Sequence, residues 1–151
     1  MIGTLTDKQI NDFLESQLWA RLGCHHEGRT YVVPFSYVLD GDGLLGQTTP
    51  GLKVDMMRAN PAVCVEVDEI KDLTDWKSVI LRGQYEELEH APAIRAMGLM
   101  IDKYGPVFRD MESATRVGRQ VKPPRLDGEV APVVLYRIHI TEKSGRFEVP
   151  D

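Results

Sequence analysis

Two tight-turn signals near the start of the chain constrain its fold more than any other feature. The sequence EGR at 27–29 separates the strand-like stretches 18–25 and 30–39, and DGDG at 40–43 separates 30–39 from 44–48. Glycine beside a small polar residue favours the backbone of a hairpin turn. Strands joined by such short connections pair antiparallel, since parallel neighbours need a long crossover. We therefore expect an antiparallel sheet or barrel and not a doubly wound parallel sheet.

Three more strands are expected further along the chain. They run from Ala62 to Val67, from Trp76 to Glu87 and from Val133 to Thr141. Gly83, inside the longest of them, is expected to mark a β-bulge because an isolated glycine weakens a regular ladder. Together with the strands around the two turns, this makes about six strands, and the predicted class is mainly β with peripheral helices.

Helical patterns precede and interrupt these strands. Thr6-Asp7-Lys8-Gln9 predicts a capping box, followed by a helix with one apolar stripe. The members of this stripe are Ile10, Phe13, Leu14 and Leu18. Thr49 is expected to cap a second helix that has Pro50 in its first turn and ends at Asn60-Pro61. The side chains expected on one side of that helix are Leu52, Met56 and Met57.

The region after the fifth strand is expected to hold two helices and a loop. Ala91 to Tyr104 predicts one helix, weakened by Gly98, and Gly105 to Val117 predicts another. Gly118 to Pro132 is rich in proline and glycine, so we expect a loop there. A role for this loop in covering a site is left open.

The bulk composition places the chain among ordinary globular proteins. Its 151 residues fit a single domain, 1–151, with 42% hydrophobic and 27% charged residues. The net charge of −5 argues against nonspecific binding to nucleic acid or to an anionic membrane. No apolar run approaches the ~20 residues that span a bilayer. The polar N-terminal segment and only two cysteines, Cys24 and Cys64, favour reduced thiols and a cytoplasmic location.

The segment from Gln47 to Lys53 combines features that suit a phosphate group. The hydroxyls of Thr48 and Thr49 can donate hydrogen bonds, the start of a helix attracts anions, and Lys53 adds a full charge. The alternative is a capped helix with a surface lysine, and the local sequence taken alone favours that alternative.

Two strand segments offer further contacts for a ligand. Pro34, between Val33 and Phe35-Ser36, removes a ladder donor and predicts a strand edge, which either bonds a planar heterocycle or only prevents aggregation. Trp76 is suited to cover a flavin ring or a substrate, and Ser78 to bond a phosphate or a ring atom. The commoner role of such a tryptophan is in a core or a dimer interface.

Motifs for hydrolytic, metal and dinucleotide chemistry are missing from the sequence. There is no HExxH, paired CxxC or GxSxG pattern, and the GDG near residue 42 opens no helix, so it is not the fingerprint of a dinucleotide-binding Rossmann site. His25 and His26 are adjacent, so on a strand they face opposite sides and do not readily share a metal. No catalytic residue is identified and no metal site is expected.

The order of these segments resembles a known family. An N-terminal helix is followed by VVPFSYVLDGDGLLGQTTPGLKVDMMRANPAVCVEVD, then by WKSVILRGQYEEL, and at the end by VVLYRIHITEKSGR. This order is similar to that of the pyridoxamine 5′-phosphate oxidase-like FMN-binding split barrels, particularly the small branch that includes nitroimidazole-resistance proteins. The resemblance implies a six-stranded antiparallel Greek-key split barrel that forms a homodimer, with FMN in two clefts between the subunits.

The resemblance also implies roles for single residues. The strand with Val33, Pro34, Phe35 and Ser36 would pass along the flavin, and the segment with Gln47, Thr48 and Thr49 would hold the ribityl chain and the phosphate. Lys53 matches the family's phosphate-binding lysine and Ser78 a position that often contacts the flavin. Many members have a basic residue where this chain has Leu52. The substrate motifs of true pyridoxamine phosphate oxidases are not recognisable, so vitamin B6 synthesis is not expected.

Two classes of function follow from this resemblance. The first is an FMN-dependent oxidoreductase that acts on a small organic substrate, with FMN supplying the redox chemistry. The second is a noncatalytic module on the same barrel that binds a flavin, a deazaflavin or haem as a carrier or sensor. The sequence identifies neither the substrate nor the electron donor.

Overall fold

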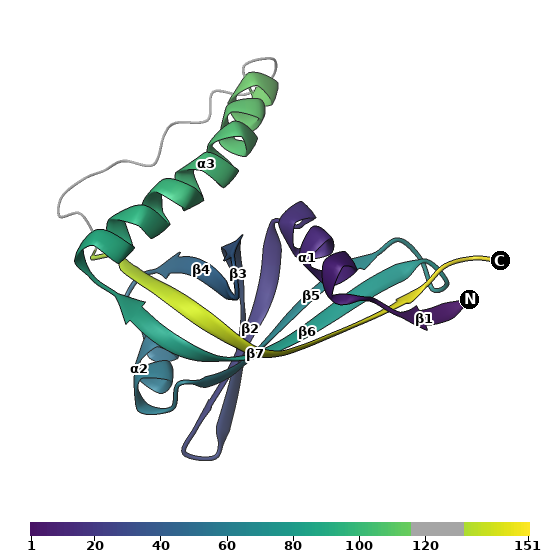
Figure 1. The fold of residues 1–151 in the computed structure, drawn as a ribbon. Coiled ribbons are helices and arrows are strands. Elements are labelled where there is room, and N and C mark those ends of the chain that lie inside the picture. Colours follow the sequence, from purple (N-terminus) through teal and green to yellow (C-terminus); the bar gives the residue numbers. More distant parts are fainter. Residues whose placement is uncertain (116–131) are drawn as a thin grey trace.

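Six antiparallel strands close into a ring in the computed structural model, which describes residues 1–115 and 132–151, with side chains as far as Met111 in the first range (Figure 1). Around the ring the order is β7-β4-β3-β2-β5-β6, and β6 pairs with β7 again. The ring matches the predicted split barrel. The elements are β1 (Ile2–Thr4), α1 (Asp7–Ser16), β2 (Trp19–His26), β3 (Arg29–Asp40), β4 (Gly43–Thr48), α2 (Leu52–Ala59), β5 (Ala62–Ile70), β6 (Trp76–Leu88), α3 (His90–Thr115) and β7 (Val134–Glu148).

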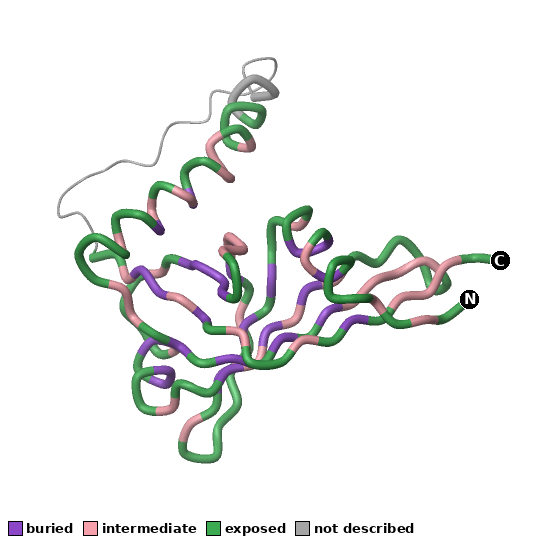
Figure 2. The backbone as a smooth tube through the Cα atoms, viewed as in Figure 1, coloured by how far each residue is buried: buried purple, intermediate pink, exposed green. Residues whose placement is uncertain are grey.

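The core fills the inside of this ring. Alternate residues of each strand point inward, as the two-residue period of a strand requires, and α1 and α2 add buried side chains to the same cluster (Figure 2). Among the described residues, its fully buried large side chains include Leu22, Tyr37, Leu44, Leu81 and Ile138. A second, smaller cluster of Leu45, Ala96 and Leu135 lies outside the ring, under α3.

The N-terminal helix begins as predicted but is shorter than expected. The Thr6 hydroxyl accepts a hydrogen bond from the Gln9 amide at 3.2 Å, and the Gln9 side chain accepts one from the Thr6 amide at 2.9 Å. The capping box is therefore confirmed. The expected stripe was wrong at its end, because α1 stops at Ser16 and Leu18 lies outside the helix with its side chain exposed.

The second helix starts two residues later than Thr49 and Pro50 predicted. Its N-cap is Gly51, and no side chain caps its first amides. The Thr48 hydroxyl instead donates to the Thr49 carbonyl at 3.3 Å. Met56 and Met57 are buried as expected, whereas Leu52 is 47% exposed. Thr49 and Pro50 therefore lie in the loop between β4 and α2, and neither of them caps the helix.

Gly83 lies at a register shift in the ladder between β6 and β7, which confirms the predicted bulge. An added Cβ at this position would lie 2.5 Å from the His139 carbonyl oxygen. The last strand was predicted too short, because β7 continues past Thr141 to Glu148. Its polar second half lacks an alternating apolar pattern and is held by pairing with β6 and β1. The strand β1 was missed for the same reason.

The two expected late helices are one continuous helix. α3 runs through Gly105 and Pro106, and it projects away from the barrel (Figure 1). The glycine–proline pair was taken as a boundary, but a helix interior accepts it here.

The start of α3 is fixed by Arg95, which with Arg137 clamps the Asp40 carboxylate at 2.8 Å and holds the pKa of Asp40 well below its usual range. The predicted Gly118–Pro132 loop falls, except for Pro132, outside the described residues.

The two cysteines occupy neighbouring strands but opposite faces of the sheet. Cys64 of β5 pairs with Gly23, the residue next to Cys24 on β2. Cys24 points into the core, where burial raises the pKa of its thiol, and Cys64 is half-buried on the outer face. Both thiols are free.

Within the described ranges, the longest and most apolar helices still fall short of what would be needed to cross a membrane.

Candidate functional site

The sheet is split between β3 and β4. β3 pairs with β2 from Arg29 to Ser36, but its ladder with β4 begins only at Tyr37, opposite Gly46. Beyond that point β4 stays with β7 and then turns into α2. One side of β3 from 29 to 36 therefore has no neighbouring strand, and its backbone groups are available to a ligand. Pro34 lies in this stretch, so the predicted edge is confirmed.

The segment leading into α2 forms the other border of this split. Its amides at the helix start have no side-chain cap, and they carry the positive end of the helix dipole. Lys53, in the first turn, is half-buried and has no carboxylate within ion-pair distance among the described residues. Burial lowers the pKa of Lys53, while the nearby Cys24 thiol group acts in the opposite direction. An anion bound here would offset the cost that burial imposes on the charged form of Lys53.

The four predicted residues of β3 face different environments. Phe35 is buried and packs its ring centroid 6.0 Å from that of Tyr37 and 6.2 Å from that of Tyr136. Val33 is half-buried against the same core. Only Pro34 and Ser36 point outward, so Phe35 can contact a ligand through its backbone alone.

Trp76 and Ser78 lie apart from these residues within the chain. The register of β5 with β6 runs from Ala62, directly after α2, to Ile70 opposite Trp76, roughly 26 Å along the strand. The Trp76 indole donates to Glu148 at 3.0 Å, and the Ser78 hydroxyl donates to Glu66 at 3.2 Å. The ten predicted residues therefore form two groups, one bordering the split and one at the far end of β6.

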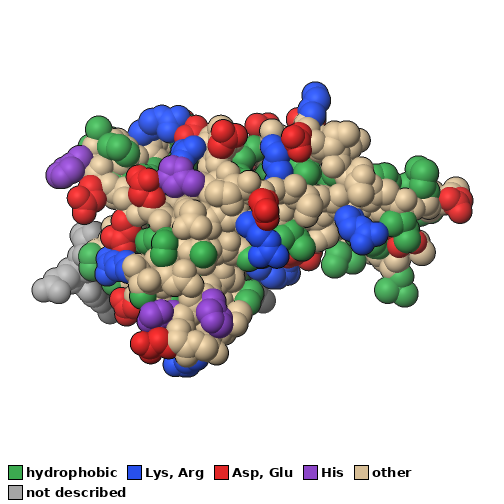
Figure 3. Space-filling model, turned by 60° about the horizontal axis from the view of Figure 1, so that its bottom comes forward, with side chains coloured by type: hydrophobic (Ala, Val, Ile, Leu, Met, Phe, Trp, Pro, Cys, Tyr) green, Lys and Arg blue, Asp and Glu red, His purple; other side chains and the backbone are tan. Residues whose placement is uncertain are grey.

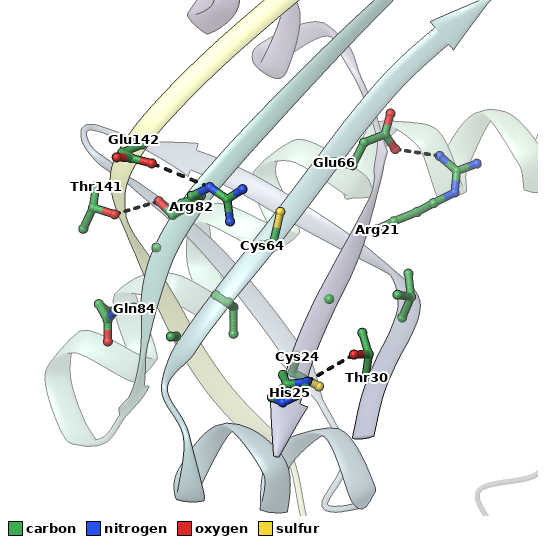
Figure 4. Close-up of a pocket in the computed structure, with 15 residues that line it drawn as sticks. Arg21, Cys24, His25, Thr30, Cys64, Glu66, Arg82, Gln84, Thr141 and Glu142 are labelled. Atoms are coloured by element: carbon green, nitrogen blue, oxygen red, sulfur yellow. Dashed lines mark hydrogen bonds and ion pairs between the residues drawn. The ribbon is translucent and has the colours of Figure 1, made fainter. Parts of the chain in front are cut away.

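A cavity of about 790 Å³ lies on the outer face of β2, β5 and β6 (Figure 4). Arg21 pairs with Glu66 at 3.1 Å, and Arg82 with Glu142 at 3.6 Å. Burial and the neighbouring Asp68 raise the pKa of Glu66. Acidic and basic side chains are also interspersed on the face shown in Figure 3. These charges largely satisfy one another, so this cavity offers no excess charge of one sign.

A second cavity, of about 580 Å³, lies between α3 and the barrel, and we call it the inner cavity. Ser36 and Gln47, both predicted site residues, meet on its wall at the closed end of the split. Trp19 of β2 and Met100 of α3 also line it. The sequence reasoning missed these last two. For Met100 the signal was present, since Met97, Met100 and Tyr104 recur at helical spacing. The expected helix ended at Tyr104, however, so this face was not recognised as one side of a cavity.

Two neighbouring side chains hold α3 over this cavity. The Tyr104 hydroxyl accepts from the Tyr37 amide at 2.8 Å and lies 2.7 Å from the Leu18 carbonyl oxygen, at the end of the ladder between β2 and β3. Lys103 donates to the Tyr37 carbonyl at 2.8 Å, with its ammonium 4.2 Å from the Tyr37 ring centroid. Burial lowers the pKa of Lys103 to about 8, although Glu15 acts in the opposite direction.

The lowered pKa of Lys103 predicts a rise in stability at alkaline pH. Between pH 8 and about 10.4 the unfolded chain retains a proton that the folded chain releases, so stability rises with pH in this window. From pH 7 to 9.5, we expect the wild type to gain about 1–2 kcal/mol of unfolding free energy relative to Lys103→Met. Urea unfolding at several pH values measures this, with the exposed Lys71→Met as control. A pH-independent difference would refute it.

Comparison with known proteins agrees with the ring and the split. A family profile described as pyridoxamine 5′-phosphate oxidase matches residues 6–147. An uncharacterized protein of Rhizobium meliloti (strain 1021) is 37% identical over 89 residues, which cover 56% of this chain and only 59% of that relative.

Solved structures extend the likeness to nearly the whole chain. A FAD-binding protein from Mesorhizobium loti is 30% identical, with 99% of this chain and 98% of that chain covered and a TM-score of 0.70. A candidate 5-nitroimidazole antibiotic resistance protein from Bacteroides thetaiotaomicron shares the fold at 17% identity, with 97% and 89% covered and a TM-score of 0.68. The chain belongs to the pyridoxamine 5′-phosphate oxidase family.

Proposed function

We propose that this protein binds a flavin nucleotide, FMN in the first instance, in the split between β3 and β4, and acts as an oxidoreductase on a small organic substrate. The observation that carries the proposal is the open edge of β3 facing a half-buried Lys53 without an acidic partner among the described residues. The FAD-binding relative at 30% identity supports a flavin.

The residues present fit such a cofactor. A phosphate would lie against Lys53 and the uncapped amides of α2, with the hydroxyls of Thr48 and Thr49 close by in the chain. The open backbone edge beside Pro34 would bond the polar rim of the ring. A bound flavin supplies hydride or electron transfer. Ser36 and Gln47 would orient ligands where the split meets the inner cavity, and α3 would exclude water there.

A homodimer is part of this proposal. Trp76 and Ser78 reach a shared cleft with Lys53 only if a second copy provides them, given their separation along β6. α3 supports a partner, because Ile94, Ile101 and Phe108 recur every seven residues and are 61–75% exposed. A cytoplasmic location fits the two free thiols and completes the proposal.

A noncatalytic module that binds a flavin, deazaflavin or haem is the second candidate. One observation favours it: among the described residues, the only ionisable side chain on the wall of the inner cavity is Tyr104, and its hydroxyl is engaged by the backbone. No described group there is available as a catalytic acid or base. Hydride transfer from a flavin needs none at the reacting atom, so this observation alone does not decide between the two.

Ligand uptake followed by reduction tests the proposal. Calorimetric titration of purified protein with FMN, FAD and a deazaflavin should give micromolar or tighter affinity for FMN, and light scattering should give a dimer. Reduced nicotinamide should then bleach the bound flavin and turn over in the presence of a suitable acceptor. A protein that takes up none of the three cofactors would rule out the flavin site, and a flavin that nicotinamide never reduces would favour the noncatalytic module.

A further inference from the structure

We propose that Tyr85 and Glu87 form a redox-active pair, in which Tyr85 gives one electron to an oxidant at the split and its proton to Glu87. The electron would pass through the ring of Tyr136, and the oxidant would be an outer-sphere one-electron acceptor. This inference goes beyond the proposed function and does not depend on a bound flavin, because the chain alone provides both the pair and the path.

The path is a row of aromatic rings that crosses the core from the split toward the surface beside α2. Phe35 belongs to the open part of β3, and its ring centroid lies 6.2 Å from that of Tyr136. The Tyr136 centroid lies 5.5 Å from that of Tyr85, with the two ring planes tilted by 39°. Rings at these separations are in contact. An electron can therefore cross the core in short steps between neighbouring rings.

Tyr85 has a charged base within one hydrogen bond. Its hydroxyl donates to a Glu87 carboxylate oxygen at 3.0 Å, because side chains two residues apart lie on the same face of a strand. Arg58 of α2 donates to both oxygens of this carboxylate, and these bonds lower the pKa of Glu87. Glu87 is therefore charged at neutral pH and able to accept the proton.

The other four tyrosines lack such a base among the described residues. The Tyr136 hydroxyl is fully buried and has no hydrogen-bond partner there. Tyr37 and Tyr104 lie against backbone carbonyls, which are weak bases, and Tyr31 is 37% exposed without a carboxylate partner. A phenol that loses an electron becomes strongly acidic, and a buried cation that keeps its proton is costly. Tyr136 can thus pass the charge on, whereas Tyr85 can hold the oxidised state.

The step at Tyr85 conserves atoms and charge. One electron leaves the phenol for the acceptor, the phenol O–H bond breaks, and the proton forms a new O–H bond on Glu87. The products are a neutral phenoxyl radical, a carboxylic acid and the reduced acceptor. A soluble one-electron reductant such as ascorbate would reverse the oxidation, and Glu87 would return the proton. The pair would in this way remove oxidising equivalents from the split.

A photo-oxidant fixed at the split tests both the path and the pair. Thr49 is exposed in the loop that borders the split, and Cys24 is buried, so a chain with Thr49→Cys and Cys64→Ser offers one accessible thiol. This thiol is labelled with a ruthenium polypyridyl complex. A flash in the presence of a sacrificial electron acceptor produces the ruthenium(III) oxidant. Transient absorption and freeze-quench electron paramagnetic resonance then record the phenoxyl radical in flavin-free protein.

We expect a phenoxyl radical in the labelled parent chain. Tyr85→Phe should lower its yield by about tenfold or more, and Tyr136→Phe and Glu87→Gln should each slow its appearance by about tenfold. Tyr31→Phe removes a tyrosine outside the path, so it is the matched control and should change neither yield nor rate. If Glu87→Gln does not fold, the parent chain is compared in H₂O and D₂O, and the radical should form more slowly in D₂O.

The results that would overturn the inference are equally specific. They are a labelled parent that yields no phenoxyl radical, a yield that Tyr85→Phe leaves unchanged, and a rate that Tyr136→Phe leaves unchanged. A rate that depends neither on Glu87 nor on D₂O would reduce the bond between Tyr85 and Glu87 to a structural tie and also overturn it. The flavin proposal is tested separately, by FMN uptake in the unlabelled chain, so failure of either leaves the other standing.

Discussion

Replacing Gly83 with alanine is expected to destabilise the barrel by about 3 kcal/mol or more, near the upper end for overpacking. The new methyl group would meet the His139 carbonyl oxygen at 2.5 Å and the Ile138 side chain at 2.7 Å. A backbone carbonyl in a ladder cannot move aside as a flexible side chain does. The bulge between β6 and β7, which closes the ring, would have to shift.

Thermal unfolding measures this effect directly. For a chain of this size the loss corresponds to a fall in Tm of roughly 6–12 °C. Gly98→Ala is the matched control, because its methyl group meets nothing within 4 Å and helix propensity favours alanine by about 0.5–1 kcal/mol. Equal and small changes in both variants would show that the bulge does not need glycine.

Replacing Lys53 with alanine is expected to weaken FMN binding by about 1–3 kcal/mol, or roughly 5–150-fold. The variant removes the cation on the α2 side of the split, where the proposed phosphate lies. It should leave unfolding of the flavin-free protein nearly unchanged, since Lys53 makes no ion pair among the described residues and its burial disfavours the charge. Calorimetry with FMN, paired with chemical unfolding, separates these two effects.

Three further variants sharpen the test at Lys53. Lys53→Arg keeps the charge and should retain most of the affinity, and Lys8→Ala, far along the chain in an exposed ion pair with Asp12, should have no effect. Leu52→Arg adds a cation on an exposed position of the same turn and should tighten binding. Unchanged affinity in Lys53→Ala would place the phosphate elsewhere.

The predictable parts of the fold are those fixed by short-range chemistry. The turns at 27–29 and 40–43, the Thr6 capping box and the bulge at Gly83 each depend on a few adjacent residues, and each was predicted correctly. The elements that were wrong depend on distant partners. The polar second half of β7 is a strand because β6 and β1 lie beside it, and α3 passes Pro106 without ending.

The candidate site shows the same division. The strand edge at Pro34 could be predicted from the sequence, because a proline lacks the N–H donor of a ladder and by itself indicates an edge. The inner cavity was not, because Trp19, Ser36, Gln47 and Met100 come from four elements that only the closed ring brings together. Whether Trp76 and Ser78 join Lys53 depends on a second copy, so their assignment stays a prediction.

The opposite orientation of Cys24 and Cys64 has a practical consequence. The two thiols sit on adjacent strands, yet the sheet itself lies between them, so they form no bond to each other while the ring is intact. Alkylation of Cys64 reports access to the outer face, whereas alkylation of Cys24 requires the strands to part. The alkylation rates of the two native thiols therefore report separate properties: the rate at Cys64 reports coverage of the outer surface, and the rate at Cys24 reports local opening of the barrel.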